Sequence, residues 1–167
     1  MDANDRPTPL MKIYLAGYIA GSVIDECTSW RKKIREHYDT WPGGRYPISC
    51  MDPLNGERFS EISSDGNKGV IPSHAIVHKD YRCVELADLV IANLNTFGQD
   101  RPMIGTFFEL AWAYDKRKPI VLITDNESYI NHPFLAYAAS WIVSDVDTLL
   151  ERKIINQFYK SFNSAEY

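Results

Sequence analysis

Residues 88–94 read DLVIANL, and this short stretch decides the fold. Its central run, LVIA, is apolar on both faces, which is typical of a strand covered by helices on either side of a sheet. Other β-prone runs recur along the chain: MKIYLAG (11–17), YPISCM (46–51), PIVLIT (119–124) and WIVSD (141–145). Together these runs predict a sheet of about five strands.

Segments with helical spacing of apolar residues separate these runs. They are 25–38 with Asp25 as the cap, 73–87, 106–117, 134–140 and 146–163. Short strands that alternate with amphipathic helices indicate the α/β class. We therefore expect a single doubly wound, flavodoxin-like domain with a central parallel sheet over residues 11–167. Residues 1–10 are polar and are expected to form a flexible tail.

Composition restricts the function classes. With 45% hydrophobic and 24% charged residues and a net charge of −4, the chain is an ordinary globular sequence without the basic surface of a nucleic-acid-binding protein. No apolar run approaches the ~20 residues of a membrane span, and the first ten residues lack a signal-peptide core. Cys27, Cys50 and Cys83 form no CxxC motif, so we expect reduced thiols and a cytoplasmic location.

In a doubly wound fold, ligands bind beyond the carboxyl ends of the strands. The segments that follow the first four strands are therefore candidates for the site: 17–22, 52–72, 93–109 and 125–132. The glycine-containing AGYIAGS segment after the first strand matches no phosphate-binding pattern, so we expect close backbone approach to a ligand there. The segment 52–72 is long and rich in Gly, Ser and Asp, which favours a functional loop.

Glu109 stands alone among apolar residues in MIGTFFELAWAY (103–114). Two roles are open and do not exclude each other. Thr106 and Glu109 fit a capping box at the start of a helix, which would make the glutamate a structural residue. The same first-turn position would also point a carboxylate, partly desolvated by Phe107, Phe108 and Trp112, into the ligand crevice as a nucleophile.

Asp80 lies in the helix that precedes DLVIANL, and taken alone it fits a solvated face beside Lys79 and Arg82. His74 and His78 share one helical face at a spacing that metal sites use, but no third ligand accompanies them, so no metal site is expected. No GxSxG nucleophile motif occurs.

Taken together, KIYLAG (12–17), DLVIANL and RPMIGTFFELAWAYDKRKPIV (101–121) resemble the nucleoside 2-deoxyribosyltransferases over most of residues 11–145. The most specific element is G-T-x-x-E-L/I-x-x-A after an aspartate-led strand. The resemblance implies transfer of 2-deoxyribose between nucleobases through a covalent deoxyribosyl-glutamate. It assigns the role of nucleophile to Glu109. It assigns proton transfer at the leaving base to Asp80, which lies eight residues before Asp88, the first residue of the strand segment.

The resemblance also implies substrate contacts. Its candidates are Tyr14, Gly17, Asp88, Asp100, Gly105, Asn131 and Tyr167, with the last two lent by a neighbouring subunit of a homo-oligomer. Asp52 and Asn55 are candidates to contact the base. The family's chemistry requires no cofactor, only carboxylates and a partly dry pocket.

Two alternative functions remain open. One is a deoxynucleoside or deoxynucleotide hydrolase, in which water resolves the intermediate. Nucleotide-cleaving relatives hold the 5′-phosphate with arginine and serine, and here only Arg101 and Ser22 are available in the corresponding loops. The other is a non-catalytic nucleoside-binding module in which Glu109 is a helix cap only.

Overall fold

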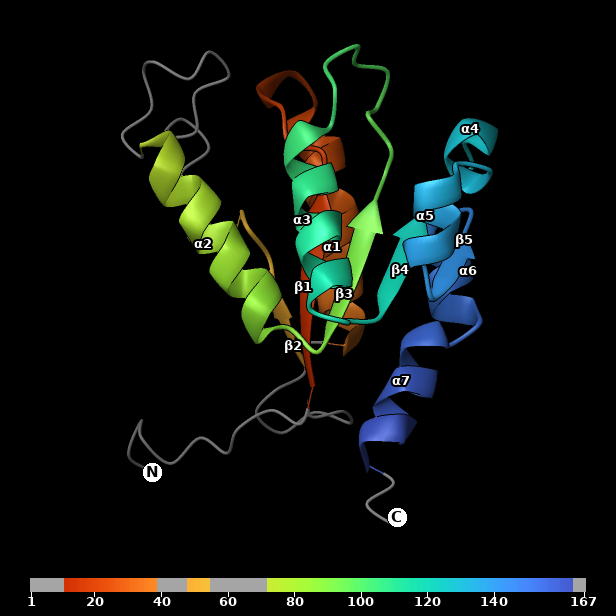
Figure 1. Ribbon diagram of the computed structural model, residues 1–167. Coiled ribbons are helices and arrows are strands. Elements are labelled where there is room, and N and C mark those ends of the chain that lie inside the picture. Colours follow the sequence, from red (N-terminus) through yellow and green to blue (C-terminus); the bar gives the residue numbers. More distant parts are fainter. Residues whose placement is uncertain (1–10, 39–47, 55–71, 164–167) are drawn as a thin grey trace.

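A computed structural model describes residues 11–38, 48–54 and 72–163, with side chains up to Tyr159. Five parallel strands form one sheet in the order β2-β1-β3-β4-β5 (Figure 1). The strands are β1 (Met11–Gly17), β2 (Ile48–Met51), β3 (Leu89–Asn93), β4 (Ile120–Ile123) and β5 (Trp141–Val143). The predicted α/β class with a flavodoxin-like strand order is therefore confirmed. The expected tail, residues 1–10, lies outside the described residues.

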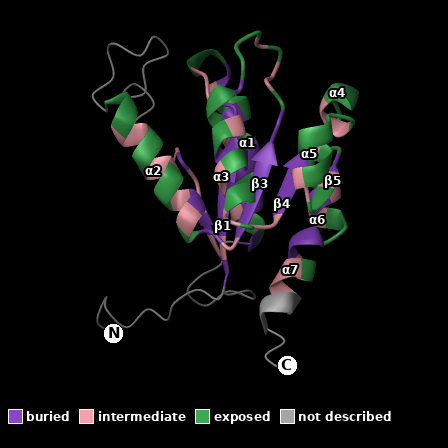
Figure 2. Ribbon diagram, in the orientation of Figure 1, coloured by how far each residue is buried: buried purple, intermediate pink, exposed green. Residues whose placement is uncertain are grey.

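Helices cover both faces of the sheet (Figure 1). One face packs against α1 (Ile24–Tyr38), α6 (Val146–Glu151) and α7 (Ile154–Asn163), and the other against α2 (Ser73–Leu86), α3 (Ile104–Asp115), α4 (Glu127–Ile130) and α5 (Pro133–Ala138). The side chains of β1 alternate between the two cores: Ile13 and Leu15 join the α1 side, while Tyr14 and Ala16 join the α2–α3 side. Figure 2 shows buried strands between helices whose outer faces are exposed.

The start of α3 differs from the prediction. The helix begins at Ile104, directly after Met103, and the N–H of Phe107 already donates to the carbonyl of Met103 at 3.1 Å. Thr106 is therefore a buried residue inside the first turn, no side chain caps this end, and Glu109 lies in the second turn. The predicted capping box is wrong, because the T-x-x-E pattern is equally compatible with a helix interior when the helix starts one turn earlier.

Three other boundaries also differ. The expected helix 146–163 is interrupted at Lys153, whose φ of 50° lies in the left-handed region, so it forms α6 and α7. The expected loop 125–132 contains the short helix α4, which the side chain of Asn126 caps. Asp25 is not the cap of α1, because a 3-10 turn, Gly21–Val23, leads directly into the helix at Ile24.

A buried guanidinium joins α1 to the carboxyl end of β1. Arg31 is fully buried and donates to the carbonyls of Leu15 at 3.3 Å, Gly17 at 3.0 Å and Cys27 at 2.6 Å. Its Nε also lies 3.6 Å from the carboxylate of Asp52, at the end of β2. These bonds satisfy a charge that would otherwise be costly to bury, and they hold the ends of two strands together.

Gly17 lies against this cluster. A Cβ at this position would come within 2.9 Å of the Trp30 ring and 3.0 Å of the carbonyl oxygen of Asn93. At Gly105, in the first turn of α3, an added Cβ would meet nothing within 4 Å. Close packing therefore requires glycine at position 17 and does not require it at position 105.

No helix in the described part of the chain is long and apolar enough to cross a membrane.

The two glycines give a matched test of this packing. Gly17→Ala should lower the free energy of unfolding by ~1–3 kcal/mol, because the strand end must shift away from Trp30 and Asn93. Gly105→Ala should raise it by ~0.5 kcal/mol, because the unfolded chain loses freedom and the helix loses nothing. Urea unfolding followed by circular dichroism measures both. A wild-type midpoint for Gly17→Ala would contradict the packing described here.

Candidate active site

A hydrogen bond between strand β1 and helix α3 forms the centre of the candidate site. The hydroxyl of Tyr14 donates to Oε1 of Glu109 at 2.6 Å. Tyr14 is fully buried and Glu109 is 7% exposed, so this is a polar contact within an otherwise apolar core face. The structure thus brings together two residues that are far apart in the sequence and that were both predicted as site residues.

Burial changes the acidity of this pair. It raises the pKa of Glu109 to about 8; the hydrogen bond from Tyr14 opposes the rise, and the negative charge of Asp80 adds to it. Burial, followed by the charge of Glu109, raises the pKa of Tyr14 well above its usual value. The phenol therefore remains a hydrogen-bond donor over the physiological range, while the carboxyl group changes ionisation close to neutral pH.

Asp80 reaches the same cluster from the middle of α2. Burial raises its pKa, and the charge of Lys79, the hydroxyl of Tyr14 and the charge of Arg31 partly oppose that rise. The single hydroxyl hydrogen of Tyr14 is donated to Glu109, and Oδ1 of Asp80 is buried with no hydrogen-bond partner among the described residues. A buried oxygen without a partner is rare in folded proteins and favours a role with a bound ligand.

The expectation that Asp80 lies on a solvated face of the helix is therefore wrong, because its side chain is only partly exposed. The helix turns it toward the sheet, together with Val84 one turn later, which is fully buried. Its sequence neighbour Arg82 does lie on the solvated side and pairs with Glu85 there.

The three side chains have complementary chemistry. A desolvated carboxylate is a good nucleophile toward an electron-poor carbon, and a second carboxyl group with a raised pKa keeps its proton to a higher pH than an ordinary aspartate does. Tyr14 holds the first carboxylate in place through a donor that does not ionise. Two carboxyl groups with separate tasks are the arrangement that cleavage of a glycosidic bond uses.

The other predicted substrate residues do not join this cluster by any described contact. Asp88 precedes β3 at its amino end, where its carboxylate accepts from the backbone N–H of Lys12 at 2.8 Å. This is a structural contact at the edge opposite the carboxyl ends of the strands. Gly17 is buried against Trp30 and Arg31, which gives it a packing role.

The remaining predicted contacts lie in exposed positions or outside the described residues. Asp100 is exposed in the loop after β3, and Gly105 is exposed in the first turn of α3. Asn131 is exposed at the end of α4, where its side chain donates to Glu127. Tyr167 and the base-contact candidate Asn55 lie outside the described residues. Their roles stay predictions.

The segment after β2 differs from expectation at Asp52. Its side chain is 6% exposed and pairs with Arg31 at 3.6 Å and Arg35 at 3.5 Å, so its carboxylate is committed to α1 instead of a base. Arg31 itself was missed in the sequence. It falls between Cys27 and Ile34 on the apolar stripe of α1, and a charge on such a stripe is the pattern that could have revealed it.

The aromatic side chains next to Glu109 do not all limit its hydration. Phe108 is 56% exposed and points away from the core, whereas Phe107 and Trp112 pack against it as partly buried residues. Phe108 therefore does not account for the burial of Glu109, whose neighbours include Tyr14 of β1 and Asp80 of α2.

Among the residues that the structure describes, no group of three or more His, Cys, Asp or Glu side chains is arranged to hold a metal ion.

Comparison with known proteins identifies the family. A family model described as nucleoside 2-deoxyribosyltransferase matches residues 13–162. No curated protein sequence matches the chain.

Several solved structures are similar in fold. A conserved protein from Enterococcus faecalis V583 has a TM-score of 0.59 at 19% identity, over 87% of this chain and 98% of that one. The solution structure of BlsM has a TM-score of 0.57 at 16% identity, over 96% and 99%. The CMP N-glycosidase BcmB of Clostridium botulinum has a TM-score of 0.54 at 14% identity, over 86% and 98%. At these identities the likeness shows the shared fold.

The raised pKa of Glu109 predicts a pH-dependent stability. The folded state keeps the proton up to about pH 8, whereas the unfolded chain loses it near 4.5, so the free energy of unfolding should fall as pH rises between these values. The slope from this one group is at most ~1.4 kcal/mol per pH unit. Urea titrations from pH 5 to 8 should show a flatter curve for Glu109→Gln than for the wild type.

Glu151→Gln is the matched control, because Glu151 is exposed and should leave the slope unchanged. Parallel curves for the wild type and Glu109→Gln would contradict a buried, protonated Glu109.

Proposed function

The chain belongs to the nucleoside 2-deoxyribosyltransferase family, and from this premise we propose that it transfers 2-deoxyribose between nucleobases. Its substrates are then 2′-deoxynucleosides and free nucleobases. The observation that carries the proposal is the buried cluster of Glu109, Tyr14 and Asp80, because it supplies a held nucleophile and a separate proton donor. A helix cap alone does not account for Glu109, since it is not at the helix end.

The reaction has two balanced steps. In the first, a carboxylate oxygen of Glu109 bonds to the anomeric carbon of the deoxyribose, the C–N glycosidic bond breaks, and the electron pair leaves with the base. Asp80 gives its proton to the departing base, which is a poor leaving group as an anion. In the second, a nitrogen of another base attacks the anomeric carbon, the bond to Glu109 breaks, and Asp80 takes back a proton from that base.

The state of Glu109 before substrate binding also follows from its pKa of about 8. At neutral pH only a minority of the molecules carry the ionised carboxylate that can attack. The hydrogen bond from Tyr14 stabilises that ionised form and fixes the oxygen that accepts it. The fraction of molecules with an ionised Glu109 should therefore increase as pH rises toward 8, whereas the same rise works against the proton that Asp80 must supply.

The surroundings favour a nucleoside over a 5′-nucleotide. Arg31 is fully buried, and its donors are already used by backbone carbonyls and Asp52. In the loop after β1, the hydroxyl of Ser22 donates to the side chain of Gln99 at 3.0 Å. Arg101 is an exposed arginine on the loop after β3. Among the described residues of these two loops, Ser22 is thus already engaged, and Arg101 is the cation available to a phosphate.

Hydrolysis is the second candidate, because it shares the first step and replaces the acceptor base with water. One solved structure with this fold is a CMP N-glycosidase. The two activities differ only in what resolves the glycosyl-enzyme, so the same assay separates them.

The proposal extends to assembly and location. We infer a homo-oligomer in which a neighbouring subunit contributes Asn131 and Tyr167 to the site, as the family resemblance implies. Cys27, Cys50 and Cys83 form no disulfide bond, which favours a cytoplasmic location.

Product analysis tests the activity. The protein is incubated with 2′-deoxyadenosine or thymidine, with and without a second base, and the products are separated by chromatography. A new deoxynucleoside that forms only with the second base supports transfer, and free deoxyribose without it supports hydrolysis. Glu109→Gln should lower either rate at least ~10³-fold, because an amide cannot act as the nucleophile.

The control variant Glu151→Gln should keep full activity, and a ribonucleoside tests whether a 2′-hydroxyl fits beside the nucleophile. Glu109→Gln preserves shape, so its thermal midpoint shows whether lost activity reflects lost folding. Full activity in a folded Glu109→Gln variant, or no base release by the wild type, would overturn the proposal.

The role of Asp80 is tested by varying the leaving group. Asp80→Asn removes the proton donor and should slow cleavage of a natural deoxynucleoside by ~10²–10⁴-fold. With 4-nitrophenyl 2-deoxyriboside, whose leaving group needs no proton, the same variant should lose less than tenfold. Steady-state kinetics on both substrates measure the difference. An equal loss on both would mean that Asp80 positions the substrate and does not transfer the proton.

A further inference from the structure

Lys79 reaches the candidate active site from the same helix turn as Asp80. Its side chain is half-buried, and its Nζ donates to the carbonyl of Pro53 at 3.1 Å, just beyond the end of β2. Met51, the last residue of that strand, pairs in register with Tyr14 of β1. The hydrogen bond to Pro53 therefore holds the ammonium group at the carboxyl end of β2, beside the strand that carries Tyr14.

The site contains two carboxyl groups, and two negative charges in one desolvated site repel each other. Burial raises the pKa of Glu109, and the charge of Asp80 adds to that rise. The titratable and charged side chains that act on Asp80 or Glu109 are Tyr14 of β1, Arg31 of α1, Lys79 and Cys83 of α2, and the two carboxyl groups themselves. Because both carboxyl groups are desolvated, a nearby cation is needed to stabilise the ionised form of either one.

Two described cations supply that stabilisation, and they act unequally. Burial raises the pKa of Glu109; the hydrogen bond from Tyr14 is the largest opposing cause, and the charge of Arg31 opposes the rise more than that of Lys79 does. Burial also raises the pKa of Asp80, but here the charge of Lys79 is the largest opposing cause, ahead of Tyr14 and Arg31. Arg31 lies on the α1 side of the sheet, whereas Lys79 shares a helix with Asp80. Each carboxyl group therefore has its own principal cation.

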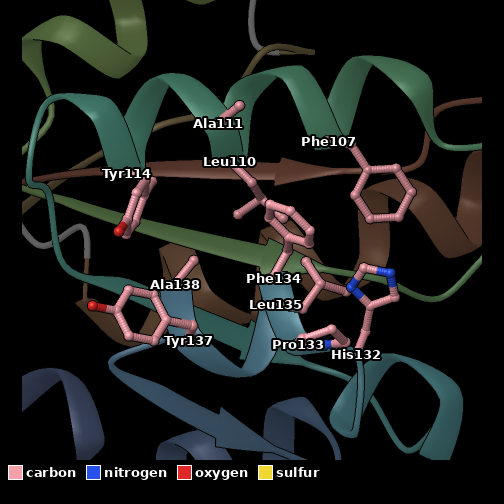
Figure 3. A pocket seen from close by; sticks show the side chains of 10 residues that line it. All are labelled: Phe107, Leu110, Ala111, Tyr114, His132, Pro133, Phe134, Leu135, Tyr137 and Ala138. Atoms are coloured by element: carbon pink, nitrogen blue, oxygen red, sulfur yellow. The ribbon is translucent and has the colours of Figure 1, made fainter.

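Other charged groups on the neighbouring helices are engaged elsewhere. Arg82 pairs with Glu85 on the outer side of α2, and Lys116 of α3 lies 3.8 Å from the same glutamate. Between α3 and α5, Figure 3 shows a groove of about 680 Å³ whose ten lining residues include no Asp, Glu, Lys or Arg. Among the described cations of α2 and α3, Lys79 is therefore the one placed to act on Asp80.

We propose that Lys79 is a positioning residue of the site, whose ammonium group, held by the carbonyl of Pro53, stabilises the carboxylate that Asp80 becomes when it gives its proton to the departing base. The inference rests on the proposed function for this step and adds no bond to it. The proton moves from Asp80 to the base, the negative charge stays on Asp80, and the fixed positive charge of Lys79 lowers the free energy of that state. A base that leaves poorly without a proton benefits most.

The first test measures the acidity of Asp80 without substrate, by carbon-13 NMR of labelled aspartate carboxyl groups in the full chain. All titrations use a Glu109→Gln background, so that one of the two coupled carboxyl groups no longer ionises, and Asp80→Asn identifies the resonance. Lys79→Met should raise the pKa of Asp80, because it removes the charge that stabilises the ionised form, and Lys79→Arg should leave that pKa nearly unchanged. Arg82→Met is the matched control: it removes the same charge from the outer side of α2 and should not move the pKa of Asp80. Lys79→Gln is a second neutral variant should Lys79→Met fail to fold.

The second test is kinetic and uses the chain with Glu109 intact. Lys79→Met should slow base release from a 2′-deoxynucleoside ~10-fold or more, but release from 4-nitrophenyl 2-deoxyriboside less than ~3-fold, because that leaving group needs no proton. Lys79→Arg should restore most of the rate. An Asp80 pKa that is the same with and without the charge of Lys79, or equal losses on the two substrates, would overturn the inference. If the wild type releases no base, the proposed function fails, while the NMR titration still decides whether Lys79 stabilises the carboxylate of Asp80.

Discussion

The hydrogen bond from Tyr14 to Glu109 is the interaction on which the candidate site depends. It joins strand β1 to helix α3, which follows the neighbouring strand β3 in the chain. It is a polar contact within an otherwise apolar face of the core. Without a donor, the carboxyl group of Glu109 would be buried at a high free-energy cost. With the donor, the carboxyl group has a fixed position and a pKa of about 8, which places it at the boundary between its acid and its base form.

The same burial has opposite consequences for stability and for chemistry. The desolvated carboxyl group of Glu109 and the oxygen of Asp80 that lacks a partner among the described residues destabilise the folded protein, and in the proposed reaction both would act on a bound substrate. Arg31, on the other face of the sheet, offsets part of the free-energy cost of burying these two carboxyl groups. By bonding to the carbonyls of Leu15 and Gly17, it holds the end of β1 just beyond Tyr14.

Much of this structure could be predicted from local pattern. The doubly apolar run of β3 and the alternation of strands and helices predicted the sheet, whereas the assignment of Glu109 rested on the resemblance of its GTxxE motif to the family. The start of α3 could not be predicted, because T-x-x-E occurs both at caps and inside helices. The burial of Asp80 and Arg31 was also missed, because burial depends on which side of a helix meets the sheet, and that is a tertiary property.

The most direct test of the catalytic account is to capture the covalent intermediate. A 2′-fluoro-2′-deoxynucleoside should form the glycosyl-enzyme and then release it slowly, because the fluorine disfavours the positively charged transition state of the second step. Intact-protein mass spectrometry should show one added fluorodeoxyribosyl group, and peptide mapping should place it on Glu109. An adduct on another residue, or release of the base from the natural substrate by a protein that never forms an adduct, would contradict the account.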